Sequence, residues 1–129
     1  MKKKVLVIDD SELCLAVIDA LIRESHLSDL VAITCCQDPI AAKELLAKRP
    51  FDLVITDLVM PNIDGYEMIA KVREVGAMPV IAVSSGYGIG DETSVLDEAK
   101  TLGADETLIK NRLQQDLIHT IDKYIRVAA

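Results

Sequence analysis

Five short runs rich in valine and isoleucine alternate with longer helix-like stretches, and this alternation limits the possible folds of the chain more than any other feature. The runs span Lys4–Ile8, Leu30–Thr34, Leu53–Thr56, Val80–Ser84 and Thr107–Ile109. Most of them lack the regular alternation of polar and apolar residues that is typical of a strand with one solvent-exposed face. We therefore interpret them as strands buried on both faces. The order of elements predicts an α/β fold with one parallel five-stranded sheet.

Start and stop signals of helices separate these runs. Ser11 and the pair Asp38-Pro39 match the preferred first residues of helices, and Gly76 and Gly103 match residues that often follow a helix end. The expected helices run from Ser11 to about Ser25, from Pro39 through Lys48, over Tyr66–Val75 after Gly65, through Val95–Leu102 and from Leu113 to the C-terminus. Because crossovers between parallel strands are right-handed, these helices should cover both faces of a doubly wound sheet.

Length and charge narrow the class of protein further. The chain has 129 residues, which fits one domain over residues 1–129. Only 3% of the residues are aromatic, so the core is expected to be aliphatic. The formal net charge is −7, which argues against direct binding of nucleic acid or of an anionic membrane, because phosphate binding needs clustered cations.

Cysteine usage and the N-terminal residues predict a cytoplasmic protein. The three cysteines, Cys14, Cys35 and Cys36, are odd in number and poorly placed for a disulfide framework, which fits a reducing compartment. We expect them to be small buried side chains rather than reactive groups. No run approaches the length of about 18 apolar residues that a membrane helix needs. The apolar run Val5–Ile8 is too short for a signal peptide.

Polar residues with useful chemistry stand just where the expected strands end. Asp9 and Asp10 follow the first run, Asp57 the third, Ser84 ends the fourth and Lys110 follows the fifth. In open parallel sheets, ligands bind beyond the carboxyl ends of the strands, so these side chains should share one rim. Three carboxylates repel one another unless a cation neutralises them, and Mg²⁺ suits a few carboxylates completed by water. A metal, a lysine and a hydroxyl donor around one carboxylate are groups that support phosphoryl transfer.

The motifs at these strand ends resemble those of a known family. They are Val7-Ile8-Asp9-Asp10-Ser11, Asp52-Leu53-Val54-Ile55-Thr56-Asp57-Leu58-Val59-Met60-Pro61, Asp64-Gly65, Pro79-Val80-Ile81-Ala82-Val83-Ser84, Gly103-Ala104 and Lys110. Over essentially its whole length, the chain resembles a receiver domain of two-component response regulators. The resemblance implies a flavodoxin-like fold with the strand order 2-1-3-4-5.

The resemblance implies a metal site and a phosphoacceptor. Asp57 would receive a phosphoryl group from a sensor histidine kinase or a histidine phosphotransfer protein, and would also be one of the metal ligands. Asp10 and the backbone carbonyl of Val59 would bind Mg²⁺ directly, and Asp9 mostly through water. The protein would be a phosphoacceptor that assists its own phosphorylation and dephosphorylation, rather than an enzyme acting on a separate substrate.

The resemblance also implies how the signal leaves the site. Ser84 would move toward the phosphoryl group once it is present, and Lys110 would pair with its oxygens. In the family, this switch repacks the surface formed by the fourth helix, the fifth strand and the fifth helix. A downstream protein target is therefore expected on that surface.

Three features depart from the family pattern. Asn111 replaces the usual proline after Lys110, so we expect a trans peptide bond, because a cis bond without proline costs about 2.5–4 kcal/mol. Thr107 replaces a frequent aromatic residue, so the output mechanism must differ or be weaker. Val59 and Gly86 stand where family members tune hydrolysis of the acyl phosphate, and neither side chain can orient a water molecule. The sequence therefore predicts a long-lived phosphorylated state.

Two other functions are compatible with parts of the pattern. A phosphorylation-independent adaptor would explain the replacements at Thr107 and Asn111. A Mg²⁺-dependent phosphohydrolase with an aspartate nucleophile, of the haloacid-dehalogenase type, would share the carboxylates. Those enzymes place their nucleophile after the first strand in an Asp-x-Asp arrangement, whereas Asp9 and Asp10 are adjacent here, and the chain has no segment for a cap domain.

Overall fold

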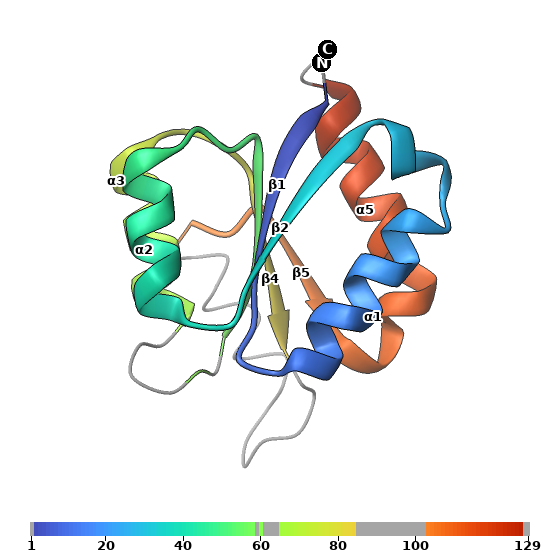
Figure 1. Cartoon of the computed structure of the whole chain (residues 1–129), viewed down its shortest axis with the longest axis horizontal. Coiled ribbons are helices and arrows are strands. Elements are labelled where there is room, and N and C mark those ends of the chain that lie inside the picture. Colours follow the sequence, from blue (N-terminus) through green and yellow to red (C-terminus); the bar gives the residue numbers. More distant parts are fainter. Residues whose placement is uncertain (1, 59, 61–64, 85–102, 128–129) are drawn as a thin grey trace.

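One parallel sheet forms the centre of the molecule (Figure 1). The computed structural model describes residues 2–58, 60, 65–84 and 103–127. The strands are β1 (Lys3–Ile8), β2 (Val31–Cys36), β3 (Leu53–Asp57), β4 (Val80–Ser84) and β5 (Glu106–Ile109). Their order across the sheet is β2-β1-β3-β4-β5, and every neighbouring pair is parallel. The predicted α/β class and the order 2-1-3-4-5 are both confirmed.

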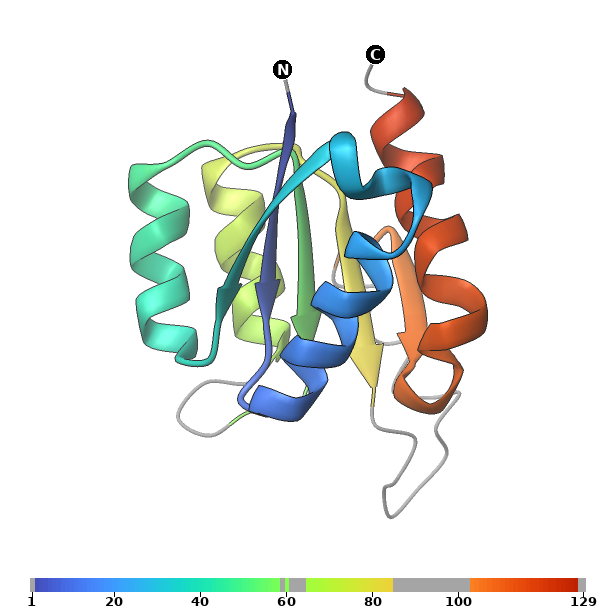
Figure 2. The same ribbon diagram turned by 45° about the vertical axis from the view of Figure 1, so that its right-hand side comes forward.

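Helices cover the sheet on both faces, as the doubly wound fold requires. The described helices are α1 (Glu12–Arg23), α2 (Pro39–Lys48), α3 (Gly65–Val75) and α5 (Leu113–Val127), with short 3₁₀ turns η1 (His26–Asp29) and η2 (Lys110–Arg112). Helices α1 and α5 lie on one face, and α2 and α3 lie on the other (Figure 2). The helix expected through Val95–Leu102 falls outside the described residues.

The predicted caps determine where the first two helices begin. The Ser11 hydroxyl accepts a hydrogen bond from the backbone N–H of Cys14 at 3.2 Å, which satisfies one of the N–H groups that a helix start leaves unpaired. The Asp38 side chain accepts from the N–H of Ile40 at 3.0 Å, and Pro39 occupies the first helical position. The position of α1 matters most for function, because this helix leaves the sheet directly after the two aspartates that follow β1.

The core has two aliphatic layers, one on each face of the sheet. Side chains of successive β1 residues alternate between them: Val5 and Val7 pack with α1 and α5, whereas Leu6 and Ile8 pack with α2 and α3. Phe51 is the single aromatic residue among the buried side chains of the described part of the chain. The prediction of an aliphatic core is confirmed.

The prediction for the second strand was wrong at both ends. Leu30 belongs to the end of η1, where its N–H donates to the carbonyl of Leu27, so the strand begins at Val31. It continues to Cys36 because its last two residues pair with Val7 and Ile8 of β1. Partners in the neighbouring strand, rather than the local sequence, determine where this strand stops.

The expectation that the strands and the cysteines are buried fails at the edge of the sheet. β2 pairs on one side only, and most of its side chains are at least partly exposed. Cys35 is exposed, and Cys14 and Cys36 are partly exposed. A side chain on an edge strand has fewer neighbours to cover it, so composition alone overestimated the burial of these thiols.

Among the described residues, no helix combines the length and the apolar character that a membrane span requires.

Candidate functional site

The carboxyl ends of four neighbouring strands bring the predicted site residues to one rim of the sheet. Asp9 and Asp10 directly follow β1, and Asp57 is the last residue of β3. Ser84 ends β4, one residue beyond the register partner of Asp57, and pairs with the last residue of β5. Lys110 comes next in the chain. The backbone register alone therefore places all five side chains at the same edge.

Three carboxylates gather at this rim. One oxygen each from Asp9, Asp10 and Asp57 lies within 4.8 Å of the others. Asp9 and Asp57 are only 1% and 4% exposed, whereas Asp10 is exposed. Such a group of like charges is unfavourable without a cation, and oxygen donors that face both the protein and the solvent suit Mg²⁺, which keeps several of its waters. The donor set at this rim therefore fits a divalent cation.

The ammonium group of Lys110 brings a positive charge to the carboxylates. Its Nζ lies 3.0 Å from Asp9 Oδ2 and 3.3 Å from Asp57 Oδ2. Burial lowers the pKa of the ammonium, but the hydrogen bond to Asp9 and the charges of Asp57 and Asp9 outweigh this effect, so the net pKa is raised. Lys110 thus stays charged and bridges two carboxylates.

Backbone hydrogen bonds hold the two buried aspartates in place. The N–H of Ser11 donates to Asp9 Oδ1 at 2.9 Å, and the N–H of Asp9 donates to the carbonyl of Cys36 at 3.1 Å. On the other strand, the Thr56 hydroxyl donates to the carbonyl of Asp57 at 3.0 Å. The Ser11 bond orients the Asp9 carboxylate before any ligand arrives, and the other two bonds hold the main chain of Asp9 and Asp57, which reduces the cost of binding.

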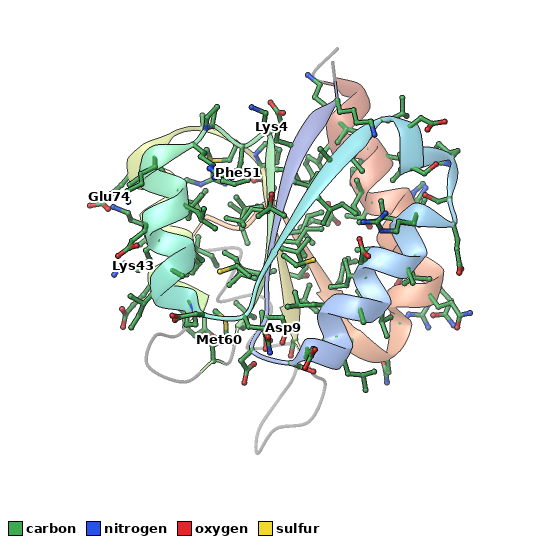
Figure 3. The ribbon with its side chains drawn as sticks, in the orientation of Figure 1. Lys4, Asp9, Lys43, Phe51, Met60 and Glu74 are labelled. Carbon is green, nitrogen blue, oxygen red and sulfur yellow. The ribbon has the colours of Figure 1, made fainter. Side chains whose placement is uncertain are left out.

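The rim lies far from the opposite end of the sheet. Figure 3 shows Asp9 and Met60 close to this rim, whereas Lys4 in the first half of β1 and Phe51, which precedes β3, lie toward the opposite end of the sheet. The acidic site is thus separated along the strands from the lysine-rich start of the chain.

Cys14 belongs to the surroundings of the site, and the sequence did not predict this. Burial raises the pKa of its thiol to about 12, and a hydrogen bond with Asp9 and the charge of Asp9 add to the effect. The available signal was the position of Cys14 in the first turn of α1, directly after the Asp9-Asp10 pair. A neutral thiol is therefore a neighbour of the buried carboxylate.

Other expectations concern the loops around the rim. The peptide bond between Lys110 and Asn111 is trans, as predicted, like the other peptide bonds of the described residues. Thr107 lies partly buried within β5. Val59, whose carbonyl was expected to bind metal, and Gly86 lie outside the described residues.

Sequence comparison identifies the family. The profile of the response regulator receiver domain matches residues 5–122. A protein-glutamate methylesterase/protein-glutamine glutaminase of Thiobacillus denitrificans is 34% identical over 134 residues, which cover 100% of this chain and 36% of that protein. The enzyme of the same description from Escherichia coli K12 is 35% identical over 112 residues, covering 87% of this chain and 31% of its own. The chain therefore spans about a third of the length of these curated relatives.

Solved structures agree with this result. The receiver domain of the Francisella response regulator 1452 has a TM-score of 0.84 and 25% identity, with 99% of this chain and 100% of that chain covered. A CheY-like receiver domain protein from Methanospirillum hungatei JF-1 has a TM-score of 0.82 and 20% identity, covering 98% and 96% of the two chains. The predicted flavodoxin-like receiver fold is thereby confirmed, and the chain belongs to the family of response regulator receiver domains.

Proposed function

We propose that this receiver domain accepts a phosphoryl group on Asp57. The observation that carries the proposal is the position of this carboxylate, which is 4% exposed, ends a central strand and lies 3.3 Å from the ammonium of Lys110. A buried carboxylate beside a cation and two further acids is suited to phosphoryl transfer, which depends mainly on positioning and charge neutralisation. Phosphorylation of an aspartate is also typical of the family.

We propose that Asp9, Asp10 and Asp57 hold Mg²⁺, with the carbonyl of Val59 as a further ligand. The grouping of the three carboxylates supports this ligand set. When bound, the ion supplies positive charge to the phosphoryl oxygens. Lys110 already touches Asp9 and Asp57, so the chain's own cation and the metal would share the neutralisation of the incoming group.

The reaction uses Asp57 as the nucleophile. One oxygen of its carboxylate attacks the phosphorus of a phosphohistidine on a sensor histidine kinase or phosphotransfer protein, the phosphorus–nitrogen bond breaks, and an acyl phosphate forms. Lys110 moves from the carboxylates to a phosphoryl oxygen. The Ser84 hydroxyl, at the end of the adjacent strand, donates a hydrogen bond to another oxygen.

The signal would then pass to a protein partner rather than to nucleic acid or a membrane. We propose β5, α5 and the helix expected through Val95–Leu102 as the contact surface. The direct connection between β5 and η2 supports this assignment. Lys110 is the first residue after β5, so a movement of its side chain toward the phosphoryl group would shift the end of the strand. We place this exchange in the cytoplasm, as the cysteine usage predicts.

One observation favours an adaptor that signals without phosphate. The usual aromatic residue of β5 is replaced by Thr107, and the nearby aromatic ring belongs to Tyr124 of α5. Its hydroxyl donates to Glu106 Oε2 at 2.7 Å and to the carbonyl of Asp105 at 3.1 Å. These bonds tie α5 to β5 at a point that the phosphorylation site does not contact directly.

Incubation with Mg²⁺ and acetyl phosphate, followed by intact-mass spectrometry, tests the proposal. Wild type should gain the mass of one phosphoryl group. Asp57→Asn should gain none, because an amide cannot form the acyl phosphate. Asp116→Asn, the same change on the exposed side of α5, should behave as wild type. The modification should not form when EDTA removes Mg²⁺ before the phosphodonor is added.

A wild type that gains no phosphoryl group from acetyl phosphate or from any phosphohistidine donor would contradict the proposal and favour the adaptor. The same experiment measures the lifetime of the modification. We expect slow decay, because neither Val59 nor Gly86 offers a side chain that orients water. Decay within seconds would show that prediction to be wrong.

A further inference from the structure

The outer edge of the sheet at β2 carries main-chain groups that have no partner among the described residues. Figure 1 shows β2 in front of the other strands, between the two helix layers. The N–H of Lys3 donates to the carbonyl of Leu30, and that of Asp9 donates to the carbonyl of Cys36, so the even-numbered residues of β2 bond to β1. The N–H and C=O groups of Val31, Ile33 and Cys35 therefore point away from the sheet.

This edge lacks the features that usually prevent strands from pairing. The sequence of β2, Val-Ala-Ile-Thr-Cys-Cys, contains no charge and no proline, and β-branched residues form half of it. A hollow lies on each face of the strand. Lys2 and Arg23 border one hollow together with Val31 and Ile33, and Ala32 borders both. From Ala32 to Cys36 the residues of β2 are at least partly exposed, whereas Val31 is buried.

Charges at the two ends of β2 are opposite in sign. Lys2, Lys4 and Arg49 lie at the hollows beside its first half, and within the described residues none of them forms an ion pair. Asp29 precedes the strand, and the Asp52 carboxylate accepts a hydrogen bond from the N–H of Lys4 at 2.7 Å, so these two acids offset two of the three charges and leave this end basic. Beyond the other end of β2 lie the exposed carboxylates of Asp38 and Asp10.

The opposite charges at the two ends of β2 favour a second copy of the same strand as the partner. In an antiparallel pair of two identical strands, the basic end of each copy faces the acidic end of the other, as a two-fold axis requires. A parallel strand of the same polarity would place like charges together. The edge is therefore complementary to itself.

We infer that two copies of this chain pair through antiparallel β2 strands and form one continuous ten-stranded sheet, since each copy contributes five strands. The residues with outward main-chain groups determine the register. The longest symmetric arrangement pairs Ile33 with Ile33 of the second copy, and Val31 with Cys35 in both directions. Each of these pairs exchanges two hydrogen bonds between N–H and C=O groups.

Sedimentation equilibrium in EDTA, without a phosphodonor and up to about 1 mM protein, tests the pairing. Wild type should show a reversible monomer–dimer equilibrium. Cys35→Pro removes an outward N–H without touching the ladder to β1, and should weaken the dimer by about tenfold or more. Cys35→Ser keeps the N–H and should dimerise as wild type. Far-ultraviolet circular dichroism verifies that both variants fold.

A second variant tests the register and does not depend on the proline. In a background in which all three cysteines are changed to serine, Ile33→Cys should form a disulfide-linked dimer on mild oxidation, because paired residues lie about 5.5 Å apart between Cα atoms. The variant that keeps only Cys35 should not, since the two copies of this residue are four positions apart and about 13 Å distant along the strands.

Three results would overturn the inference: a monomer at every concentration, a dimer that Cys35→Pro leaves unchanged while the fold is intact, or cross-linking through Cys35 rather than position 33. The experiment uses neither Mg²⁺ nor phosphate, so its outcome is independent of the proposed phosphorylation of Asp57.

Discussion

Strands β3 and β2 are built from similar residues but differ in burial and in function. Both contain the pair Ile-Thr, preceded by small or aliphatic side chains. Every residue of β3 is buried, because β1 and β4 pair with it on either side and helices cover both faces. In β2, only Val31 is buried. The place of a strand in the sheet therefore decides burial more strongly than its composition does.

The same difference separates two kinds of function. The central strand can hold the Asp57 carboxylate at 4% exposure because neighbouring strand ends bring Lys110 to it. Such a site is rigid and shielded from water, which strengthens charge interactions. The edge strand has no neighbour on its outer side and presents main-chain groups to a partner. The centre of the sheet is thus suited to chemistry, and its edge to association.

The largest effect should come from matched isoleucine truncations in the two strands. Ile55→Ala in β3 removes a side chain that is 1% exposed, and should lower the free energy of unfolding by about 2–5 kcal/mol. Ile33→Ala in β2 removes a partly exposed side chain, and should cost about 1 kcal/mol. Urea unfolding followed by circular dichroism, at low protein concentration, measures both. Equal losses would mean that the edge position does not matter.

An intermediate effect should come from the lysine between the carboxylates. Lys110→Met leaves Asp9 and Asp57 without their cation, which should lower the free energy of unfolding in EDTA by about 1–3 kcal/mol at pH 7.5. Because the remaining carboxylates can then be neutralised, lower pH or added Mg²⁺ should recover part of the loss. Lys48→Met, at an exposed position, is the control and should change stability by less than about 0.5 kcal/mol. A destabilisation that is the same at pH 5.5 and with Mg²⁺ would argue against the charge explanation.

The smallest effect should appear in the alkaline range. In the folded protein the pKa of the Cys14 thiol is raised to about 12, whereas in the unfolded chain it lies near the ordinary value of 9.0. The unfolded state then binds fewer protons, so stability falls as pH rises from 9 toward 12. In EDTA, Cys14→Ser should remove about 1 kcal/mol of this loss at pH 10.

Cys35→Ser is the matched control on the edge strand. Burial also raises the pKa of the Cys35 thiol, but this residue is exposed, so its replacement should alter the alkaline slope less. Urea unfolding at pH 8, 9 and 10 compares the three proteins. An alkaline slope that Cys14→Ser leaves unchanged would show that this thiol ionises normally in the fold.

Much of this arrangement was predictable from local patterns. The N-caps Ser11 and Asp38 and the bounds of β4 are as predicted, because capping and apolar runs depend on neighbours in the chain. The start of α3 was less exact, since Gly65 lies inside the helix rather than before it. The candidate site residues followed from the same logic, because parallel strands put their carboxyl ends at one rim.

By itself, then, the sequence determined the five strands, the four described α-helices, the polarity of the sheet and the set of side chains at its carboxyl rim. Only the tertiary structure decided that Lys110 bridges Asp9 and Asp57, that Cys14 touches this site and that β2 extends to Cys36 with its outer edge unpaired. The physical reason is distance along the chain. Asp9 and Lys110 meet only because the four neighbouring strands β1, β3, β4 and β5 align in register, and neither periodicity nor capping carries that information.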